Sequence, residues 1–237
     1  MIVVGAAGRM GTLICPWLEG SAEFELVSRI ERDEDLGAAL RPHSGALAID
    51  VTAAGLGFQH GLAILAAGLR PVIGTSGVTP EEVAELDACA RETKLGGIVV
   101  PNFSLGMCAL QLAAELIATA PFESARIVET HSPEKLDSPS GTALDTSRRI
   151  GAVRESLEVA IESRRIPDAN ALQQVLFESE HERLNLTHEA LSREAYLPGI
   201  RAALLYASKA EGIAHGLHVA LRDGALNSRP AAARPGQ

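Results

Sequence analysis

The chain has 237 residues, of which 46% are hydrophobic and 22% charged, a composition typical of a globular protein with a sizeable core. Its formal net charge is -9 and aromatic residues make up only 3%, which argues against a nucleic-acid-binding surface of basic patches and stacking rings. Cys15, Cys89 and Cys108 are far apart, so we expect neither a disulfide framework nor a metal site. No apolar run approaches the roughly 18 residues of a membrane span, and no basic signal region is present, so we expect a cytoplasmic protein without membrane contacts.

The N-terminal part of the chain alternates short apolar runs with helical patterns, which predicts a parallel sheet with helices on both faces. Strands are expected at MIVV, FELVSRIE, ALAIDVT, RPVIGT and GGIVV. Helices are expected at MGTLICPWLEG, GFQHGLAILAAG and TPEEVAELDACARET, the last with Thr79 as N-cap, Pro80 in the first turn and Glu82 completing a capping box. Little chain separates Glu31 from Ala46, so we expect one element of the usual doubly wound domain to be missing or shortened there.

The pattern changes at VPNFSLG, which is the expected domain boundary. Helices are predicted beyond it at LGMCALQLAAELIATA, TALDTSRRIGAVRESL and GIRAALLYASKA. Strands are predicted at ARIVETH, LEVAIESRRI, QQVLFES and ERLNLTHEA, and their period of two indicates an antiparallel or mixed sheet. The Pro- and Ala-rich tail NSRPAAARPGQ is expected to fray.

Gly5, Gly8 and Gly11 lie between the first strand and the first helix. This spacing allows a tight turn whose backbone N–H groups can approach a pyrophosphate, although a turn without any ligand is the alternative. The second strand ends at Glu31 and Arg32. A carboxylate there would suit the ribose of NADH and a guanidinium the 2′-phosphate of NADPH, so the choice of cofactor stays open.

Three further loops, IDVT, GTSG and VPNFS, follow predicted strands of the same sheet. The carboxyl ends of parallel strands lie at one edge, where open α/β sheets bind ligands. We therefore expect these loops to form the crevice for the nicotinamide half of the cofactor.

The stretch ETHSPEKLDSPSGTAL places His131 and Lys135 beside the start of a predicted helix. A helix start offers unpaired N–H groups and a partial positive charge, so it is a ready anion site, and Lys135 would strengthen it. A lone histidine is more often a structural residue than a catalyst, and for His131 both interpretations remain open.

The motifs GAAGRMG, GTSG, PNFSLGM, HSPEKLDSPSGTAL and ERLNLTHEALSREAYLPGIRAA occur in this order, and together they resemble the dihydrodipicolinate reductase family over almost the whole chain. The resemblance implies an α/β fold: a Rossmann-like dinucleotide-binding domain over residues 1–102 with a C-terminal return over 193–237, and an α+β domain over 103–192. The second domain would bind the substrate, and its open mixed sheet would build a homotetramer. The implied reaction is the reduction by NADH or NADPH of 4-hydroxy-tetrahydrodipicolinate, a small dicarboxylate, in lysine and diaminopimelate biosynthesis.

The resemblance also assigns residues by position. His131 and Lys135 match the family's catalytic histidine and its proton-donating lysine, and His188 matches a position near the site. The cofactor positions are Gly5, Gly8, Arg9, Met10, Gly11, Glu31, Arg32, Gly74, Thr75, Ser76, Asn102 and Phe103. The substrate positions are Ser132, Ser140, Gly141, Thr142 and Arg193.

The chain departs from the family pattern mainly on the substrate side. Ser132 replaces the second histidine of a His-His pair, ALQQVLF replaces a Gly-x-His pattern, and GTSG replaces GTTG. Two alternatives therefore stay open: a related reductase of another cyclic imine or enamine acid, and a non-catalytic dinucleotide-binding sensor. Retention of Lys135 and SPSGTAL argues against the sensor. A basic side chain such as Arg165 or Arg193 could replace the missing imidazole near Ser132.

Overall fold

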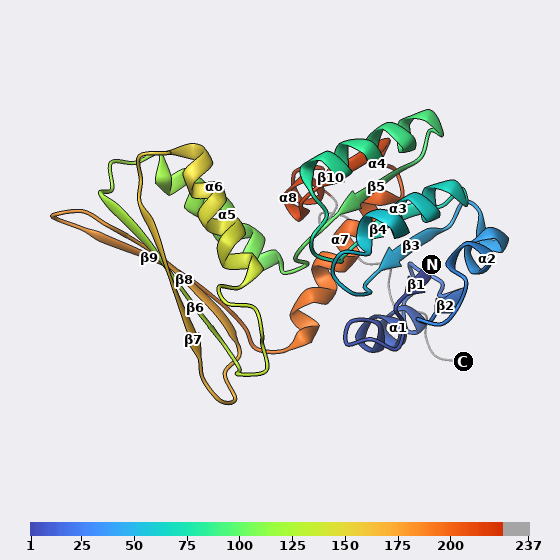
Figure 1. Cartoon of the computed structure of the whole chain (residues 1–237), viewed down its shortest axis with the longest axis horizontal. Coiled ribbons are helices and arrows are strands. Elements are labelled where there is room, and N and C mark those ends of the chain that lie inside the picture. Colours follow the sequence, from blue (N-terminus) through green and yellow to red (C-terminus); the bar gives the residue numbers. More distant parts are fainter. Residues whose placement is uncertain (225–237) are drawn as a thin grey trace. The chain divides into compact units, whose positions relative to one another are not determined.

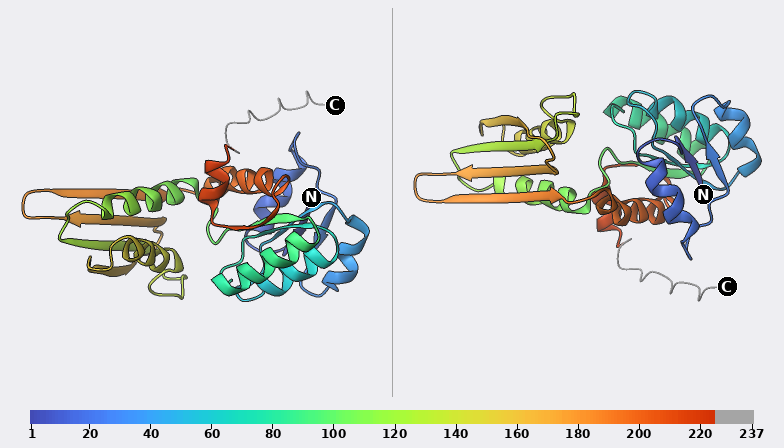
Figure 2. Two further views of the ribbon diagram at one scale, coloured as in Figure 1. Left: turned by 90° about the horizontal axis from the view of Figure 1, so that it is seen from above. Right: turned by 90° about the horizontal axis from the view of Figure 1, so that it is seen from below.

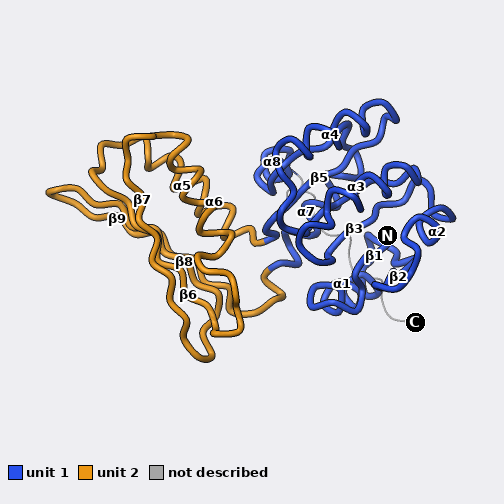
Figure 3. The backbone as a smooth tube through the Cα atoms, in the orientation of Figure 1, with its two compact units in different colours: residues 1–103, 196–237 blue, residues 104–195 orange. Residues whose placement is uncertain are grey.

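The computed structural model describes residues 1–224, which form two compact units (Figure 3). The first unit contains Met1–Phe103 and the segment that starts at Tyr196, and the second contains Ser104–Ala195. The chain therefore leaves the first unit after Phe103 and returns to it near its end. The tail NSRPAAARPGQ, which the sequence predicts to fray, lies outside the described residues.

The first unit is built on a six-stranded parallel sheet with the order β10-β5-β4-β3-β1-β2 (Figure 1). The predicted strand FELVSRIE is a strand only at its C-terminal end, and β10 was not predicted. The strands are β1 (Ile2–Val4), β2 (Ser28–Ile30), β3 (Leu47–Asp50), β4 (Arg70–Ile73), β5 (Gly96–Val99) and β10 (Gly212–His215).

Helices cover both faces of this sheet, as predicted. α3 and α4 lie on one face, and α1 and α7 on the other (Figure 2). The segment between β2 and β3 holds only a five-residue helix and a 3-10 turn, so the expected shortening is confirmed. The helices are α1 (Gly11–Glu19), α2 (Leu36–Leu40), α3 (Gly57–Ala66), α4 (Pro80–Glu92), α7 (Leu197–Ala207) and α8 (Leu217–Arg222), with the 3-10 turn η1 (Arg41–His43). A second 3-10 turn, η2 (Arg193–Tyr196), lies where the chain passes from the second unit back to the first.

Local signals placed α4 correctly. The Thr79 hydroxyl accepts the Glu82 N–H at 3.2 Å, and the Thr79 N–H donates to Glu82 Oε2 at 2.8 Å, which completes the predicted capping box. Apolar side chains of α3, α4 and the strands are buried between helix and sheet, with Ile64, Ile73 and Leu86 fully inaccessible. This core holds the strands in place, and the loops that follow their C-terminal ends are the ones predicted to bind the cofactor.

The second unit is a four-stranded sheet in the order β7-β6-β8-β9 with two helices on one face (Figure 1). β6 and β7 are parallel, whereas β8 is antiparallel to both β6 and β9, so the predicted mixed sheet is confirmed. Ala125, Ile127, Val175 and Phe177 pack in the core with residues of the helices. The elements are α5 (Leu105–Ala118), β6 (Ser124–His131), α6 (Gly141–Val153), β7 (Val159–Arg165), β8 (Ala171–Glu178) and β9 (Arg183–Ala190).

No helix among residues 1–224 has both the length and the apolar character needed to cross a membrane.

Candidate active site

The glycine-rich turn between β1 and α1 has a geometry that requires glycine. Gly5 has a φ of +85°, in the left-handed region that favours glycine. A Cβ atom on Gly11 would lie 2.3 Å from the backbone oxygens of Gly5 and Ala6, so no side chain fits at that position. The Gly8 N–H donates to the Gly5 carbonyl at 3.0 Å and closes the turn.

The start of α1 fits a phosphate group. Within the described residues no side chain caps α1, which follows Met10 directly, whereas Ser104 and Ser140 cap α5 and α6. The N–H groups of Thr12 and Leu13 donate to the carbonyls of Gly8 and Met10, so an anion at this helix N-terminus would bind to the N–H groups that precede them in the chain. The turn and the helix start together therefore fit the pyrophosphate of a dinucleotide, at the predicted positions Gly8, Arg9, Met10 and Gly11.

Glu31 and Arg32 follow β2 at the same edge of the sheet. The Gly5 N–H donates to the Ile30 carbonyl at 2.9 Å, which places the end of β2 beside the glycine-rich turn. Both side chains are exposed, and the Glu31 N–H donates to the Glu34 carboxylate at 2.7 Å. Both side chains are therefore accessible at the edge of the sheet that carries the glycine-rich turn.

Asp50 connects the loops after β3 and β4, and this role was not predicted from the sequence. Its buried carboxylate accepts the Thr52 hydroxyl at 2.6 Å through Oδ1 and the Thr75 hydroxyl at 2.8 Å through Oδ2. His60 Nδ1 on α3 lies 3.3 Å from Oδ1. Thr75 is thus a buried residue that shapes the loop through Asp50, while its neighbour Ser76 is exposed.

Gly74 and Phe103 bring the ends of β4 and β5 together. A Cβ atom on Gly74 would lie 2.4 Å from Cε2 of Phe103, so the buried ring packs directly against the glycine backbone. The Gly74 N–H donates to the Asp50 carbonyl at 2.8 Å. Asn102 precedes Phe103 on the same loop. The predicted nicotinamide positions therefore lie on adjacent loops at one edge of the parallel sheet.

In the second unit, the start of α6 already holds side-chain carboxylates of this chain. Ser140 is the N-cap, and its hydroxyl accepts the Ala143 N–H at 3.2 Å. The Ser140 N–H donates to Oε1 of Glu129 at 3.3 Å, and the Gly141 N–H to Oδ2 of Asp137 at 3.4 Å. The backbone N–H groups of Ser140 and Gly141 therefore bind carboxylates, which is the chemistry expected of the predicted anion site at this helix start.

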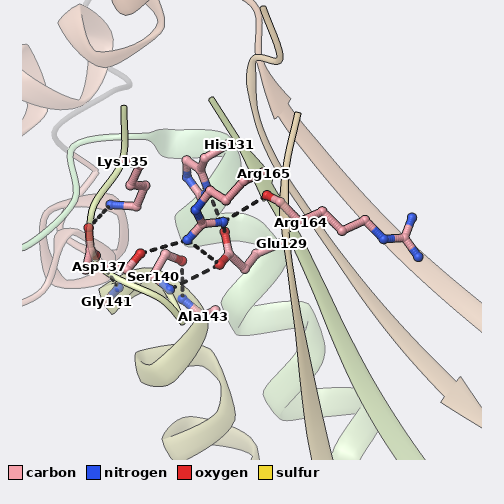
Figure 4. A network of polar contacts seen from close by, with 9 residues as sticks. All are labelled: Glu129, His131, Lys135, Asp137, Ser140, Gly141, Ala143, Arg164 and Arg165. Atoms are coloured by element: carbon pink, nitrogen blue, oxygen red, sulfur yellow. Dashed lines mark hydrogen bonds and ion pairs between the residues drawn. The ribbon is translucent and has the colours of Figure 1, made fainter. Parts of the chain in front are cut away.

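Lys135 binds the carboxylate of Asp137, which also accepts the Gly141 N–H. Its ammonium nitrogen donates to Oδ1 of Asp137 at 2.8 Å (Figure 4). The hydrogen bond from Lys135 lowers the pKa of Asp137, which keeps this carboxyl ionised at neutral pH. Lys135 and the first turn of α6 therefore converge on one anionic group.

His131 is held by a buried glutamate. Glu129 lies two residues before it on β6 and is fully inaccessible, and Oε2 of Glu129 bonds to Nδ1 of His131 (Figure 4). Arg165 of β7, the register partner of His131, donates to both Glu129 oxygens, at 3.0 and 3.1 Å, and to the Asp137 carbonyl at 2.7 Å. Burial raises the pKa of Glu129, but the bonds from Arg165 and His131 outweigh it and the net pKa lies below the usual value.

The structure does not gather every predicted substrate residue. Ser132 is half-buried next to His131, whereas Arg193 lies exposed on η2 and does not join the contacts around His131 and Lys135. Of the two arginines that could replace the missing imidazole, Arg165 is therefore the one in the network. His188 lies elsewhere in this unit, with Nε2 3.0 Å from the Ser104 hydroxyl at the start of α5.

The sequence contains a local signal for Glu129, which is not among the predicted site residues. Residues i and i+2 of a strand share one face, so Glu-x-His at the end of a predicted strand places both side chains together. The contact between Glu129 and Arg165 had no such local signal, because it depends on the pairing of β6 with β7. The altered motif ALQQVLF places Gln173 in the core, where it donates to the Thr146 hydroxyl of α6 at 2.8 Å.

Comparison with known proteins covers both units. Residues 1–103 match the family model "Dihydrodipicolinate reductase, N-terminus" and residues 104–221 match "Dihydrodipicolinate reductase, C-terminus". The 4-hydroxy-tetrahydrodipicolinate reductase of Legionella pneumophila (strain Philadelphia 1) is 34% identical over 236 residues, covering 92% of this chain and 97% of the relative. The enzyme of the same name from Coxiella burnetii (strain Dugway 5J108-111) is 33% identical with the same coverage.

Solved structures agree with this result. The dipicolinate-bound dihydrodipicolinate reductase from Paenisporosarcina sp. TG-14 superposes with a TM-score of 0.82 at 26% identity, covering 92% of this chain and 97% of that one. The apo scyllo-inositol dehydrogenase from Lactobacillus casei, at 10% identity and a TM-score of 0.64, shares the fold. The matches over both units and the relatives at about one-third identity show that this chain belongs to the dihydrodipicolinate reductase family.

Proposed function

We propose that this chain reduces 4-hydroxy-tetrahydrodipicolinate to tetrahydrodipicolinate with NADH or NADPH, in lysine and diaminopimelate biosynthesis. The family models and the relatives of that name over 92% of the chain support this reaction. The conversion replaces a ring hydroxyl by hydrogen and releases water. It therefore needs a hydride, a proton and a site that binds carboxylates.

The cofactor would supply the hydride, and the loops of the parallel sheet would bind and orient it. The glycine-rich turn and the start of α1 would hold its pyrophosphate, and Glu31 or Arg32 its adenosine ribose. Gly74, Ser76, Asn102 and Phe103 would line the nicotinamide, with Thr75 holding the loop in shape through Asp50.

The observation that carries the substrate side is the convergence of Lys135 and the Gly141 N–H on the Asp137 carboxylate. A substrate carboxylate in that place would meet a cation and the positive end of a 13-residue helix. Lys135 would bind this anion and donate the proton as the hydride arrives. Ser132, Ser140 and Thr142 surround the same turn, and a relative in this family has been crystallised with the dicarboxylate dipicolinate.

We propose a homotetramer as the working form, and the open sheet of the second unit supports this assembly. Its core-facing residues alternate with Arg126, Leu172, Gln174 and Leu176, which lie on the face opposite α5 and α6. A second copy of the chain would cover that face. Light scattering coupled to gel filtration measures the mass directly, and a monomer at working concentration would contradict this assembly.

A related reductase of another cyclic imine or enamine acid is the second candidate, and Ser132 favours it. A hydroxyl there cannot provide the positive charge that a histidine provides when it is protonated. Arg165 does not supply a simple replacement, because its guanidinium is already bound to Glu129 and the Asp137 carbonyl. The substrate range therefore needs a direct test.

The deciding experiment is a coupled assay in which a separate synthase makes the substrate from pyruvate and aspartate semialdehyde. Loss of reduced nicotinamide absorbance is followed with NADH and with NADPH in parallel. Rapid oxidation with either cofactor is the expected result and ranks the two. Cofactor binding without oxidation would contradict the proposal and favour the second candidate or a sensor.

A further inference from the structure

Glu129 contacts three separate parts of the second unit through one buried carboxylate. Oε2 bonds to His131 Nδ1 on the same strand and accepts Nη1 of Arg165 on β7 at 3.1 Å. Oε1 accepts Nη2 of Arg165 at 3.0 Å and the Ser140 N–H, at the start of α6, at 3.3 Å. Figure 4 shows these side chains pointing toward one another.

The negative charge of Glu129 determines which ring nitrogen of a neutral His131 carries the proton. Burial raises the pKa of Glu129, but the hydrogen bonds that it accepts, foremost those of Arg165 to both oxygens, outweigh burial and lower the pKa, so Glu129 is a carboxylate at neutral pH. An ionised carboxylate accepts hydrogen bonds and cannot donate them. The proton of a neutral His131 ring must therefore reside on Nδ1, which leaves Nε2 as the acceptor end of the ring.

We propose that Glu129 is a positioning residue that fixes His131 as the Nδ1–H tautomer and holds its ring in register with the anion-binding turn of α6. The second effect arises because the same carboxylate also binds the Ser140 N–H directly and the Asp137 carbonyl through Arg165. The effect on the tautomer stands by itself. The effect on turnover rests on the function proposed above.

A purely structural ion pair between Glu129 and Arg165 would explain why Glu129 is buried, but it would not determine the tautomer of His131. Glu129→Gln separates the two explanations. The Oε1 position faces two donors, Nη2 of Arg165 and the Ser140 N–H, whereas the Oε2 position faces one donor of fixed direction, Nη1 of Arg165, beside His131 Nδ1. We therefore expect the amide oxygen at the Oε1 position and the NH₂ group facing His131. His131 Nδ1 must then accept, and the ring changes to the Nε2–H tautomer.

The tautomer can be read without any turnover. ¹⁵N solid-state NMR of sedimented protein labelled at histidine distinguishes protonated from unprotonated ring nitrogens, and His131→Asn identifies the His131 signals among the seven histidines. We expect Nδ1–H for the neutral form of the ring, recorded in mildly alkaline buffer, in the unaltered protein and in Glu129→Asp. We expect Nε2–H in Glu129→Gln. Glu123→Gln, an exposed carboxylate just before the same strand, is the matched control and should match the unaltered protein.

An Nε2–H ring in the unaltered protein would overturn the proposal even if Glu129→Gln failed to fold. So would an unchanged Nδ1–H ring in a folded Glu129→Gln variant.

The kinetic part is measured in the coupled assay. We expect Glu129→Gln to lower kcat by about 10²-fold with little change in the KM for the cofactor, and Glu129→Asp to recover part of the loss. A changed tautomer with normal kcat would overturn the role in turnover. If the unaltered protein itself is inactive, the proposed function has failed, and the NMR result on Glu129 stands independently of it.

Discussion

The Lys135 ammonium nitrogen lies 2.8 Å from Oδ1 of Asp137, while Oδ2 of the same carboxylate faces the Gly141 N–H at 3.4 Å. Asp137 thus occupies the place where a lysine and a helix start can both reach an anion. A substrate carboxylate that binds there would exchange places with Asp137. The pair therefore makes the substrate-side proposal testable at single residues.

Lys135→Met should abolish most turnover without affecting cofactor binding. The substitution removes the proton donor and one partner of the substrate anion, and we expect kcat to fall by about 10²-fold or more. NADH and NADPH binding, followed by nicotinamide fluorescence, should stay within the range of the unaltered protein. Lys209→Met is the matched control, because Lys209 pairs with Asp223 in the other unit. Near-normal kcat in Lys135→Met would remove Lys135 from the proposed chemistry.

Asp137→Asn should strengthen the binding of dicarboxylates. The amide carries no charge, so it competes less well for Lys135 than the carboxylate does. We expect the dissociation constant of dipicolinate to fall about 5-fold, which corresponds to an interaction of roughly 1 kcal/mol at an exposed ion pair. Isothermal titration calorimetry measures this directly. Weaker binding in the variant would instead mean that Asp137 holds Lys135 in its working position.

Much of the fold could be predicted because its signals are local. The capping box of Thr79 and Glu82 and the apolar strands of the parallel sheet are specified by neighbouring residues. β10 was missed because four residues, GIAH, carry no period of their own, and the strand exists only by pairing with β5 from far away in the chain. The helix predicted to run to Leu157 ends at Val153 for a similar reason, since the extended Arg154 donates to the carbonyls of Ala120 and Phe122, which are far away in the chain.

In the candidate site, too, the contacts between residues close in sequence could be predicted, whereas those that depend on strand pairing could not. Lys135 and the Ser140 turn are close in sequence, and the spacing of one motif was enough to expect them together. Arg165 reaches Glu129 only through the β6–β7 register, which pairs His131 with Arg165. Asp50 was missed because its partners Thr52 and Thr75 come from the ends of two strands.

Gly11→Ala should disrupt the cofactor loop. The added Cβ atom would lie 2.3 Å from two backbone oxygens, so the turn must open or shift. We expect the affinity for NADH and NADPH to fall at least about 10-fold, since the displaced N–H groups can no longer converge on a pyrophosphate. Gly20→Ala at the other end of α1 is the control, because its nearest neighbour would be 3.8 Å away. Equal cofactor affinity in the two variants would argue against the turn as the pyrophosphate site.

His188 should make the stability of the protein depend on pH. Burial lowers the pKa of His188, so the folded state binds its proton less readily than the unfolded state does. The stabilising effect is complete above the unfolded pKa of about 6.5 and is lost as the pH falls toward the lower folded value. Urea unfolding at several pH values between about 5 and 8 should show the free energy of unfolding decreasing toward acid. His188→Asn should flatten this dependence, because it removes the titrating ring beside Ser104. His181→Asn is the control: this residue is exposed, so its substitution should leave the pH dependence unchanged. A slope that persists unchanged in His188→Asn would assign the pH dependence to other groups.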